Sequence, residues 1–417
     1  MHNEKINILF VPSDLAGVGH FRSIWPAQQI NKDFGDKFYV EVSNQVNLND
    51  FEYLSKFKII HFHRELGNFE NRIEIFKKLR ELGIIIIMDI DDYWMPPTTH
   101  PLHYMVVKNK IDFKITEMFK ISDYVTTTTD IFAKEIGKFN KNVFVIPNAL
   151  ASNHQMWNGE DAKQTDKVRI TWIGGSSHLH DLMKVQDDMN RINSDSELVD
   201  KYQIILCGYD TRGSATQIMP DGREITRKIL PAESVWNEFE KIFTTNYSIC
   251  DEDYIKYLKK CSKESYKNMS ESEFKYLRRW TLPLTQYGKH YDYCDICLAP
   301  LDENMFNYCK SELKIIEAGF KKKVLIAQDY GIYHELIKNG ENGILIPTKD
   351  NNKGWHKALK KLILDKEYRD MLANNLHEFV VNNYTLEIVT KKRVEFYEQI
   401  VTKANKPKQE FADSIIP

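Results

Sequence analysis

Apolar runs of strand length recur along the chain, and amphipathic segments of helix length separate them. In the first part of the chain, these runs occupy residues 6–12, 38–43, 59–63, 84–90, 124–129 and 143–148. Each run is continuously apolar rather than alternating, which is typical of strands that are buried on both faces of a parallel sheet. Helices on both sides of such a sheet are therefore expected.

The same pattern restarts after a polar stretch at 151–167, which reads as a linker. The second series of apolar runs occupies residues 168–175, 202–208, 295–301, 323–328 and 342–347. Two such series predict an α/β fold with two Rossmann-like, doubly wound domains, at 1–160 and 165–385. We expect a final helix at 386–405 to pack back on the first domain. Ligands of such sheets bind beyond the carboxyl ends of the strands, so a cleft between the domains is the expected site.

One segment interrupts this rhythm. About eighty residues, roughly 209–290, separate two predicted strands, whereas a crossover connection needs far fewer. The segment is rich in Lys, Glu and Tyr and predicts charged helices. It is either a solvated helical insertion or an element that binds an acceptor or a partner.

Composition restricts the function classes. The 417 residues are 42% hydrophobic and 28% charged with a net charge of −2, so no global basic field attracts nucleic acid or anionic lipid. The longest apolar run, at 84–88, is too short to cross a bilayer, and the first residues read as a strand rather than a signal peptide. We expect a cytoplasmic protein, with peripheral membrane association left open. Cys294 and Cys297 form a CxxC within a strand pattern, which disfavours a zinc site.

A glycine-containing loop at 13–22 follows the first predicted strand. Gly17 and Gly19 permit a tight turn and close approach of a ligand to the backbone. A helix that begins near Phe21 would offer free N–H groups to an anion or a sugar, and Arg22 would add charge. A simple strand-to-helix turn explains the loop equally well.

Three aspartates, Asp89, Asp91 and Asp92, follow the apolar strand at 84–90. One interpretation is a DxD motif that holds a divalent cation and a nucleotide diphosphate, because hard oxygen ligands suit Mg²⁺ or Mn²⁺. A second is acceptor binding or transition-state electrostatics without metal, and a third is a helix cap and turn. His61 and His63 share one strand face as core, cleft-lining or metal-binding residues.

Two further stretches suit an anion. Gly174, Gly175 and Ser176 follow the first strand of the second domain, where their N–H groups would receive phosphate oxygens or Ser176 would cap a helix. This stretch lacks the Gly-Lys-Ser/Thr of a P-loop, which disfavours an NTPase.

The second stretch is the helix start at 310–320. Unpaired N–H groups at Ser311 to Lys314, with Lys310 and Lys314, would bind a diphosphate. Glu317 on the apolar side of this helix needs hydrogen-bond donors, either ribose hydroxyls or an internal cation. Glu312 would repel a diphosphate and should point away.

The block at 306–346 resembles the C-terminal signature of retaining nucleotide-sugar glycosyltransferases of the GT-B fold, the group 1 or family 4-like enzymes. Residues 146–150, 172–175, 295–301 and 17–22 are similar to the same family. The resemblance implies that Glu317 binds the nucleotide ribose, that residues 311–314 cradle the diphosphate, and that Gly17 and Gly19 face donor and acceptor. The sequence departs from the family at Cys309, where a glutamate is usual, and in 172–182, which lacks the usual Arg and Lys.

These observations lead to the hypothesis of a hexosyltransferase that uses a UDP- or GDP-sugar and retains anomeric configuration. No cofactor or metal would be required, although a divalent metal stays possible. The assigned catalytic residues are Asp91, Arg22 and Lys310. The donor-binding residues are Gly17, Gly19, Gly174, Gly175, Ser176, Lys310, Ser311, Glu312, Leu313, Lys314 and Glu317, and the acceptor-binding residues are His20, His63, Asp89 and Asp92.

The acceptor is left open as a glycan, a lipid-linked compound, a protein or modified DNA. A DNA acceptor is considered because the basic, aromatic stretches "KYLKK" and "YLRRW" in the insertion would track a nucleic-acid backbone. Other rivals are a nucleotide-sugar epimerase or hydrolase, a metal-dependent transferase and a non-catalytic nucleotide-binding module.

Overall fold

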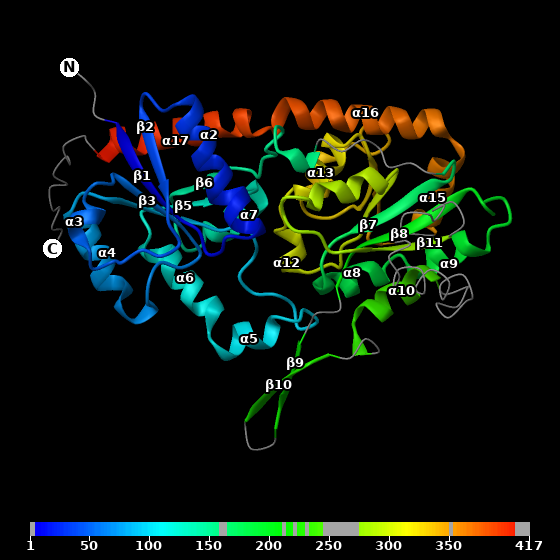
Figure 1. The fold of residues 1–417 in the computed structure, drawn as a ribbon, viewed down its shortest axis with the longest axis horizontal. Helices are drawn as coiled ribbons and strands as arrows, with labels where there is room; N and C mark the ends of the chain where they lie inside the picture. Colours follow the sequence, from blue (N-terminus) through cyan, green and yellow to red (C-terminus); the bar gives the residue numbers. More distant parts are fainter. Residues whose placement is uncertain are drawn as a thin grey trace, which may run out of the picture. The chain divides into compact units, whose positions relative to one another are not determined.

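The computed structural model describes residues 5–157, 165–210, 214–219, 223–229, 233–244, 275–349 and 353–404. These residues divide into two units (Figure 1). Unit 1 comprises the described residues within 1–91, 113–149 and 384–417, and unit 2 those within 92–112 and 150–383. The expected division of the chain near residue 160 does not include one feature of this grouping, which is that residues 92–112 belong to unit 2. In this segment the ring of His100 packs against Phe306, with 5.1 Å between centroids.

Unit 1 is built on a six-stranded parallel sheet. Its strands are β1 (Ile6–Val11), β2 (Phe38–Val42), β3 (Ile59–His63), β4 (Ile85–Asp89), β5 (Tyr124–Thr127) and β6 (Val143–Val145). They lie in the order β2-β1-β3-β4-β5-β6, so the direction of winding reverses between β1 and β3. The two central strands β3 and β4 are buried along their whole length. All six strands predicted for the first domain are confirmed.

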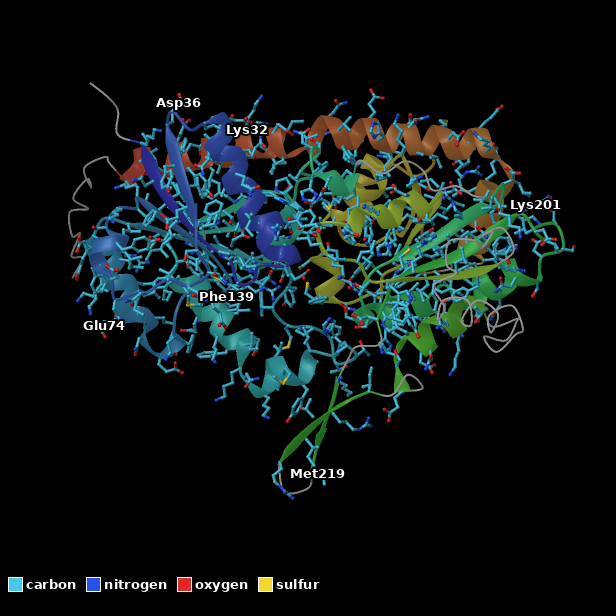
Figure 2. The ribbon with its side chains drawn as sticks, in the orientation of Figure 1. Lys32, Asp36, Glu74, Phe139, Lys201 and Met219 are labelled. Atoms are coloured by element: carbon cyan, nitrogen blue, oxygen red, sulfur yellow. The ribbon has the colours of Figure 1, made fainter. Side chains whose placement is uncertain are left out.

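The helices of unit 1 cover this sheet. They are α1 (Gly17–Gly19), a π-helical turn (His20–Ile24), α2 (Trp25–Asp33), α3 (Phe51–Leu54), α4 (Arg72–Glu81), α6 (Ile111–Ile121), α7 (Asp130–Ile136) and α17 (Leu386–Ala404). The last helix packs beside α2, and its Tyr397 hydroxyl lies 2.6 Å from His61 Nδ1 in the core. The charged side chains of Lys32, Asp36 and Glu74 lie on the outside of the unit (Figure 2).

Unit 2 also contains a six-stranded parallel sheet. Its strands are β7 (Val168–Ile173), β8 (Tyr202–Tyr209), β11 (Tyr276–Trp280), β12 (Ile296–Ala299), β13 (Val324–Gln328) and β14 (Ile344–Ile346). Their order, β11-β8-β7-β12-β13-β14, is the strand order of the dinucleotide-binding fold, with the reversal between β7 and β12. The five strands predicted for this domain are confirmed, and β11 is an addition.

The prediction that residues 209–290 form charged helices is wrong for the described parts at 214–218, 224–228 and 276–280, whereas residues 245–274 lie outside the described residues. Strands β9 (Ser214–Ile218) and β10 (Glu224–Lys228) pair as an antiparallel hairpin, and α10 (Trp236–Thr244) follows. The stretch "YLRRW" is the edge strand β11, because Tyr276 and Leu277 are buried and the Arg278 guanidinium forms an ion pair with buried Glu240. The stretch "KYLKK" lies outside the described residues. Arg278 is therefore buried and paired, so its charge does not contribute to an exposed basic face of the kind that suggested a DNA acceptor.

The remaining helices of unit 2 flank its sheet and its loops. They are α5 (His103–Lys108), α8 (Leu179–Met183), α9 (Gln186–Ser194), α12 (Met305–Tyr308), α13 (Leu313–Phe320), α14 (Ile332–Leu336), α15 (Gly354–Leu364) and α16 (Lys366–Asn383). Short 3-10 turns accompany them in the described part of the unit, at Gln155–Trp157, Ser176–His178 and Tyr287–Tyr293. Across the residues that the structure describes, no helix has the length and apolar character needed to cross a bilayer.

Candidate functional site

A pocket with about 750 Å³ of empty space, part of it open to solvent, lies in unit 2. It forms where β7 and β12 end, and these two strands are the neighbours at which the strand order reverses. This is the position at which doubly wound sheets bind their ligands. The lining residues are Asp92, Trp172, Ile173, His178, Tyr287, Leu298, Ala299, Pro300, Leu301, Lys310, Ser311, Leu313, Lys314, Glu317 and Tyr333.

The start of α13 supplies the positive side of this pocket. Lys310, Ser311, Leu313 and Lys314 all line it. The N-cap is Glu312 rather than Ser311, and the Glu312 side chain makes no capping hydrogen bond. The first intrahelical donors are Ile315 and Ile316, so the preceding N–H groups have no partner within the helix. The helix start and two ammonium groups together favour a multiply charged anion. Glu312 itself is buried and does not belong to the lining.

Glu317 lies in the same pocket and is only 2% exposed. Its Oε2 accepts a hydrogen bond of 2.7 Å from the Tyr291 hydroxyl, and Lys314 Nζ approaches the same oxygen at 3.4 Å. Burial and the Glu317 carboxylate raise the pKa of Tyr287 and Tyr291 well above the usual range, so both phenols stay protonated and act as donors. Glu317 therefore lines the pocket and also contacts a cation, and its role toward a ribose stays a prediction.

The loop after β7 contributes differently from the prediction. Trp172, Ile173 and His178 line the pocket, whereas Gly174, Gly175 and Ser176 are not among its lining residues. A Cβ atom on Gly174 would lie 2.6 Å from the Trp172 ring, so the glycine makes room for that side chain. Burial and the nearby Lys310 lower the pKa of His178, and its ring contacts Asp181 Oδ2 at 2.7 Å. Neutral His178 thus donates from Nδ1 and keeps Nε2 as a hydrogen-bond acceptor.

The three predicted aspartates take separate roles. Asp92 lines the pocket of unit 2, whereas Asp89 and Asp91 belong to unit 1. Asp89 accepts two hydrogen bonds from Arg22, at 2.8 and 2.7 Å, and these side chains are 3% and 1% exposed. Burial alone would raise the pKa of Asp89, but the Arg22 guanidinium outweighs it and holds this pKa below the usual range. Arg22 and Asp89 satisfy each other, so their assigned contacts with catalytic or acceptor groups are corrected to a buried structural pair.

The predicted histidines are all held by neighbours. His63 is 2% exposed, with Nδ1 at 2.8 Å from Ser13 Oγ and Nε2 at 3.0 Å from Asp91 Oδ1. His61 contacts Thr126 and Tyr397, as a core histidine does. His20 contacts the Ala16 carbonyl through Nδ1 at 2.9 Å. Asp91 therefore belongs to a hydrogen-bonded group with His63 and Ser13.

The geometry of a metal site does not arise from the described side chains. No group of three or more His, Cys, Asp or Glu side chains within the described ranges has an arrangement suited to a metal ion. Both carboxylate oxygens of Asp89 accept hydrogen bonds from Arg22, so a cation bound in a DxD arrangement would compete with the guanidinium for these oxygens. Cys294 and Cys297 are buried free thiols, and Cys297 lies in β12.

The loop after β1 starts its helix earlier than predicted, at Gly17 rather than near Phe21. The Asp14 carboxylate accepts hydrogen bonds from the N–H groups of Ala16 and Gly19, at 2.8 and 3.2 Å, and so fixes the turn. The Gly19 N–H is therefore engaged within the loop.

Replacing Gly19 by alanine is expected to destabilise the protein by about 1–3 kcal/mol, because the backbone must shift to admit the methyl group. A Cβ atom there would lie 1.9 Å from the Asp14 carbonyl oxygen, whereas at Gly17 it would meet nothing within 4 Å. Urea unfolding of Gly19→Ala and of the matched control Gly17→Ala measures the difference. Equal unfolding free energies for the two variants would contradict this explanation of Gly19.

The sequence did not reveal some residues of the pocket in unit 2, nor the serine that contacts His63 in unit 1. Tyr287 and Tyr291 come from a turn within the segment interpreted as a helical insertion. Their signal was a pair of tyrosines four residues apart, directly before the strand that delivers the pocket. Ser13 lies one residue beyond the first predicted strand, and only its distance to His63 reveals it.

Part of the sequence matches a known protein family. Residues 310–379 match the family model described as Glycosyl transferases group 1. No curated protein sequence matches the chain.

Similar solved structures cover nearly the whole chain. Sucrose-phosphate synthase from Thermosynechococcus elongatus is 11% identical, with a TM-score of 0.57 over 96% of this chain and 100% of that one. A glycosyltransferase from Rickettsia africae is 14% identical, with a TM-score of 0.58 over 96% and 99%. Anabaena HepE in complex with UDP and glucose is 11% identical, with a TM-score of 0.57 over 94% and 100%. The chain therefore has the GT-B fold, and its residues 310–379 carry the glycosyl transferases group 1 signature.

Proposed function

We propose that the protein is a glycosyltransferase that moves a sugar from a nucleotide diphosphate sugar to an acceptor hydroxyl. The observation that carries this proposal is the position of Glu317. It lines the same pocket as Lys310 and Lys314, at the ends of β7 and β12, where the strand order reverses. A buried carboxylate next to an anion-binding helix start suits a ligand that presents both hydroxyls and phosphates. A nucleoside diphosphate has this combination in its ribose and its two phosphates.

The proposed roles follow from the chemistry of each group. Glu317 accepts hydrogen bonds from the ribose hydroxyls, and the start of α13 with Lys310 and Lys314 receives the diphosphate. These cations stabilise the charge that develops on the leaving diphosphate, so catalysis consists mainly of positioning and electrostatic stabilisation without a required metal. Retention of anomeric configuration is proposed from the resemblance of residues 306–346.

A UDP-sugar is the first donor to test, followed by a GDP-sugar. HepE, a protein of the same fold, is known in complexes with UDP and with UDP-glucose. Unit 1 is proposed to bind the acceptor, a glycan, lipid-linked compound or protein. A cytoplasmic location is proposed because Cys207, Cys294, Cys297 and Cys309 are free thiols.

The test is a thermal-shift screen of UDP, GDP, ADP and their glucose derivatives, followed by measurement of nucleoside diphosphate release. At least one nucleotide should raise the unfolding temperature, and its sugar derivative should be turned over with EDTA present. Binding without release would favour a non-catalytic module, and release with an epimerised free sugar would favour an epimerase. A screen in which no nucleotide stabilises the protein would overturn the proposal.

A further inference from the structure

Three polar side chains of unit 1 form a hydrogen-bonded chain at one edge of its sheet. Ser13 follows β1, His63 ends β3 and Asp91 follows β4, and these strands are adjacent in the order β1-β3-β4. Ser13 Oγ lies 2.8 Å from His63 Nδ1, and His63 Nε2 lies 3.0 Å from Asp91 Oδ1. Ser13 is exposed, His63 is buried and Asp91 is nearly buried. The chain therefore runs from a buried acid to a hydroxyl that solvent and ligands reach.

The protonation state of this chain follows from its partners. Burial alone would raise the pKa of Asp91, but His63 and Arg64 outweigh it and hold this pKa below the usual range. Ionised Asp91 only accepts hydrogen bonds, so the neutral tautomer of His63 that makes this contact is the one with its proton on Nε2. The Nδ1 lone pair is then directed to the Ser13 hydroxyl and accepts its hydrogen bond. This order of donors and acceptors makes Ser13 more basic and more nucleophilic than an ordinary serine.

Two other charged groups contact the chain. Arg64 Nη2 donates to Asp91 Oδ1 at 3.3 Å, and the Asp14 carboxylate accepts from Ser13 Oγ at 3.3 Å. Asp14 competes with His63 Nδ1 for the Ser13 proton, and the contact with Nδ1 is the shorter of the two at 2.8 Å. Arg64 adopts a positive φ of 62°, a costly conformation for a side-chain-bearing residue that concentrates at functional sites. Arg22 and Asp89 neutralise each other in the core. His61, two residues before His63 on β3, contacts Tyr397 and Thr126 instead of a serine.

We propose that Ser13, His63 and Asp91 form a proton relay that takes the proton from a hydroxyl group of a ligand bound at this edge of unit 1. The assignment of that ligand as the acceptor of glycosyl transfer rests on the proposed function. Ser13 touches the ligand, and His63 and Asp91 are positioning residues that act through it.

The relay accounts for every proton and bond of the transfer. The acceptor oxygen forms a bond to the anomeric carbon on the same face from which the diphosphate oxygen departs, so that the bond to the diphosphate breaks and the configuration is retained. The nucleoside diphosphate leaves with the electron pair. The acceptor proton passes to Ser13 Oγ as the Ser13 proton passes to His63 Nδ1, and the resulting imidazolium is stabilised by Asp91. His63 then loses this proton to water.

The first test measures Ser13 directly and needs no glycosyl donor. The full chain is treated with diisopropyl fluorophosphate, and modified serines are located by mass spectrometry. We expect Ser13 to react at least about tenfold faster than Ser55, an exposed serine whose hydroxyl bonds to the Glu52 carbonyl. The variants His63→Asn and Asp91→Asn should lose the advantage, and Ser13→Ala should lose the label. The matched control His61→Asn should keep it, and thermal unfolding checks that each variant is folded.

Two results would overturn the relay: Ser13 reacting no faster than Ser55, or a folded His63→Asn protein labelled as fast as the wild type. The second test uses UDP-glucose with water as the acceptor and follows UDP release. Ser13→Ala and His63→Asn should lower kcat by about 10²-fold at unchanged KM, and an unchanged kcat would contradict the role in transfer. Rapid Ser13 labelling in a protein that turns over no nucleotide sugar would support the activated hydroxyl and contradict the proposed function.

Discussion

The Arg22→Ala variant is expected to lose about 3–5 kcal/mol of unfolding free energy, the largest stability effect that we predict for a single side chain. The change leaves the Asp89 carboxylate buried without its guanidinium partner, and it also removes the Arg22 hydrogen bond to the Ile146 carbonyl. Urea unfolding followed by tryptophan fluorescence measures the loss.

The matched control is Arg80→Ala, which breaks an Arg–Asp pair on the surface of the same unit. Arg80 Nε lies 2.8 Å from Asp123 Oδ1, but the Arg80 side chain is 42% exposed. Water replaces such a partner, so the control should lose less than about 1 kcal/mol. If both variants lose the same small amount, the buried pair does not have the role assigned to it.

The same pair sets a direction for acid destabilisation. The pKa of Asp89 is lower in the folded protein than its ordinary value of 3.8. A depressed carboxyl pKa contributes stability that is fully present above the unfolded value and is lost as the pH falls through the folded value. In Arg22→Ala the guanidinium is gone and burial raises the pKa of Asp89. The difference in stability between wild type and variant should therefore begin to shrink as the pH falls through that raised value, and it should shrink further below about pH 4, where the wild type loses its own contribution.

The Glu317→Ala variant is expected to bind the nucleoside diphosphate about 10- to 100-fold more weakly, because a charged hydrogen-bond acceptor for the ribose is lost. Isothermal titration with the nucleotide that most stabilises the wild type measures this change. Glu317→Gln tests charge separately from volume, and it should also weaken binding.

Glu367→Gln on α16 is the matched control, since it removes an exposed carboxylate from the same unit. It should leave the dissociation constant unchanged. Equal dissociation constants for Glu317→Ala and the wild type would remove the ribose assignment.

Strands were predictable wherever burial on both faces made the sequence continuously apolar. Strand β11 escaped this rule because it contains Arg278, whose buried charge is paired with Glu240, a residue 38 positions earlier. A tertiary partner at that distance leaves no local pattern. The antiparallel pair β9–β10 was missed because the composition of the whole segment was read as one, whereas the short strands SATQI and EITRK differ from its Lys-, Glu- and Tyr-rich part.

The sequence reveals only one part of the pocket in unit 2. Lys310, Lys314 and Glu317 lie on one helix start, so their spacing alone brings them together. The other lining residues come from the end of β7 and from the turn at Tyr287–Tyr293, which only the fold unites. Arg22 and Asp89 show the opposite error, because residues 67 positions apart each suggested reactivity and instead satisfy one another.

The chain leaves unit 1 and returns to it, and this imposes an order on biosynthesis. Unit 2 ends at residue 383, while α17 begins at Leu386. As a nascent polypeptide emerges from the ribosome, the later unit is complete while the earlier one still lacks the helix that brings Tyr397 to His61. Unit 1, although most of it is synthesised first, therefore cannot complete its native contacts until α17 has been synthesised.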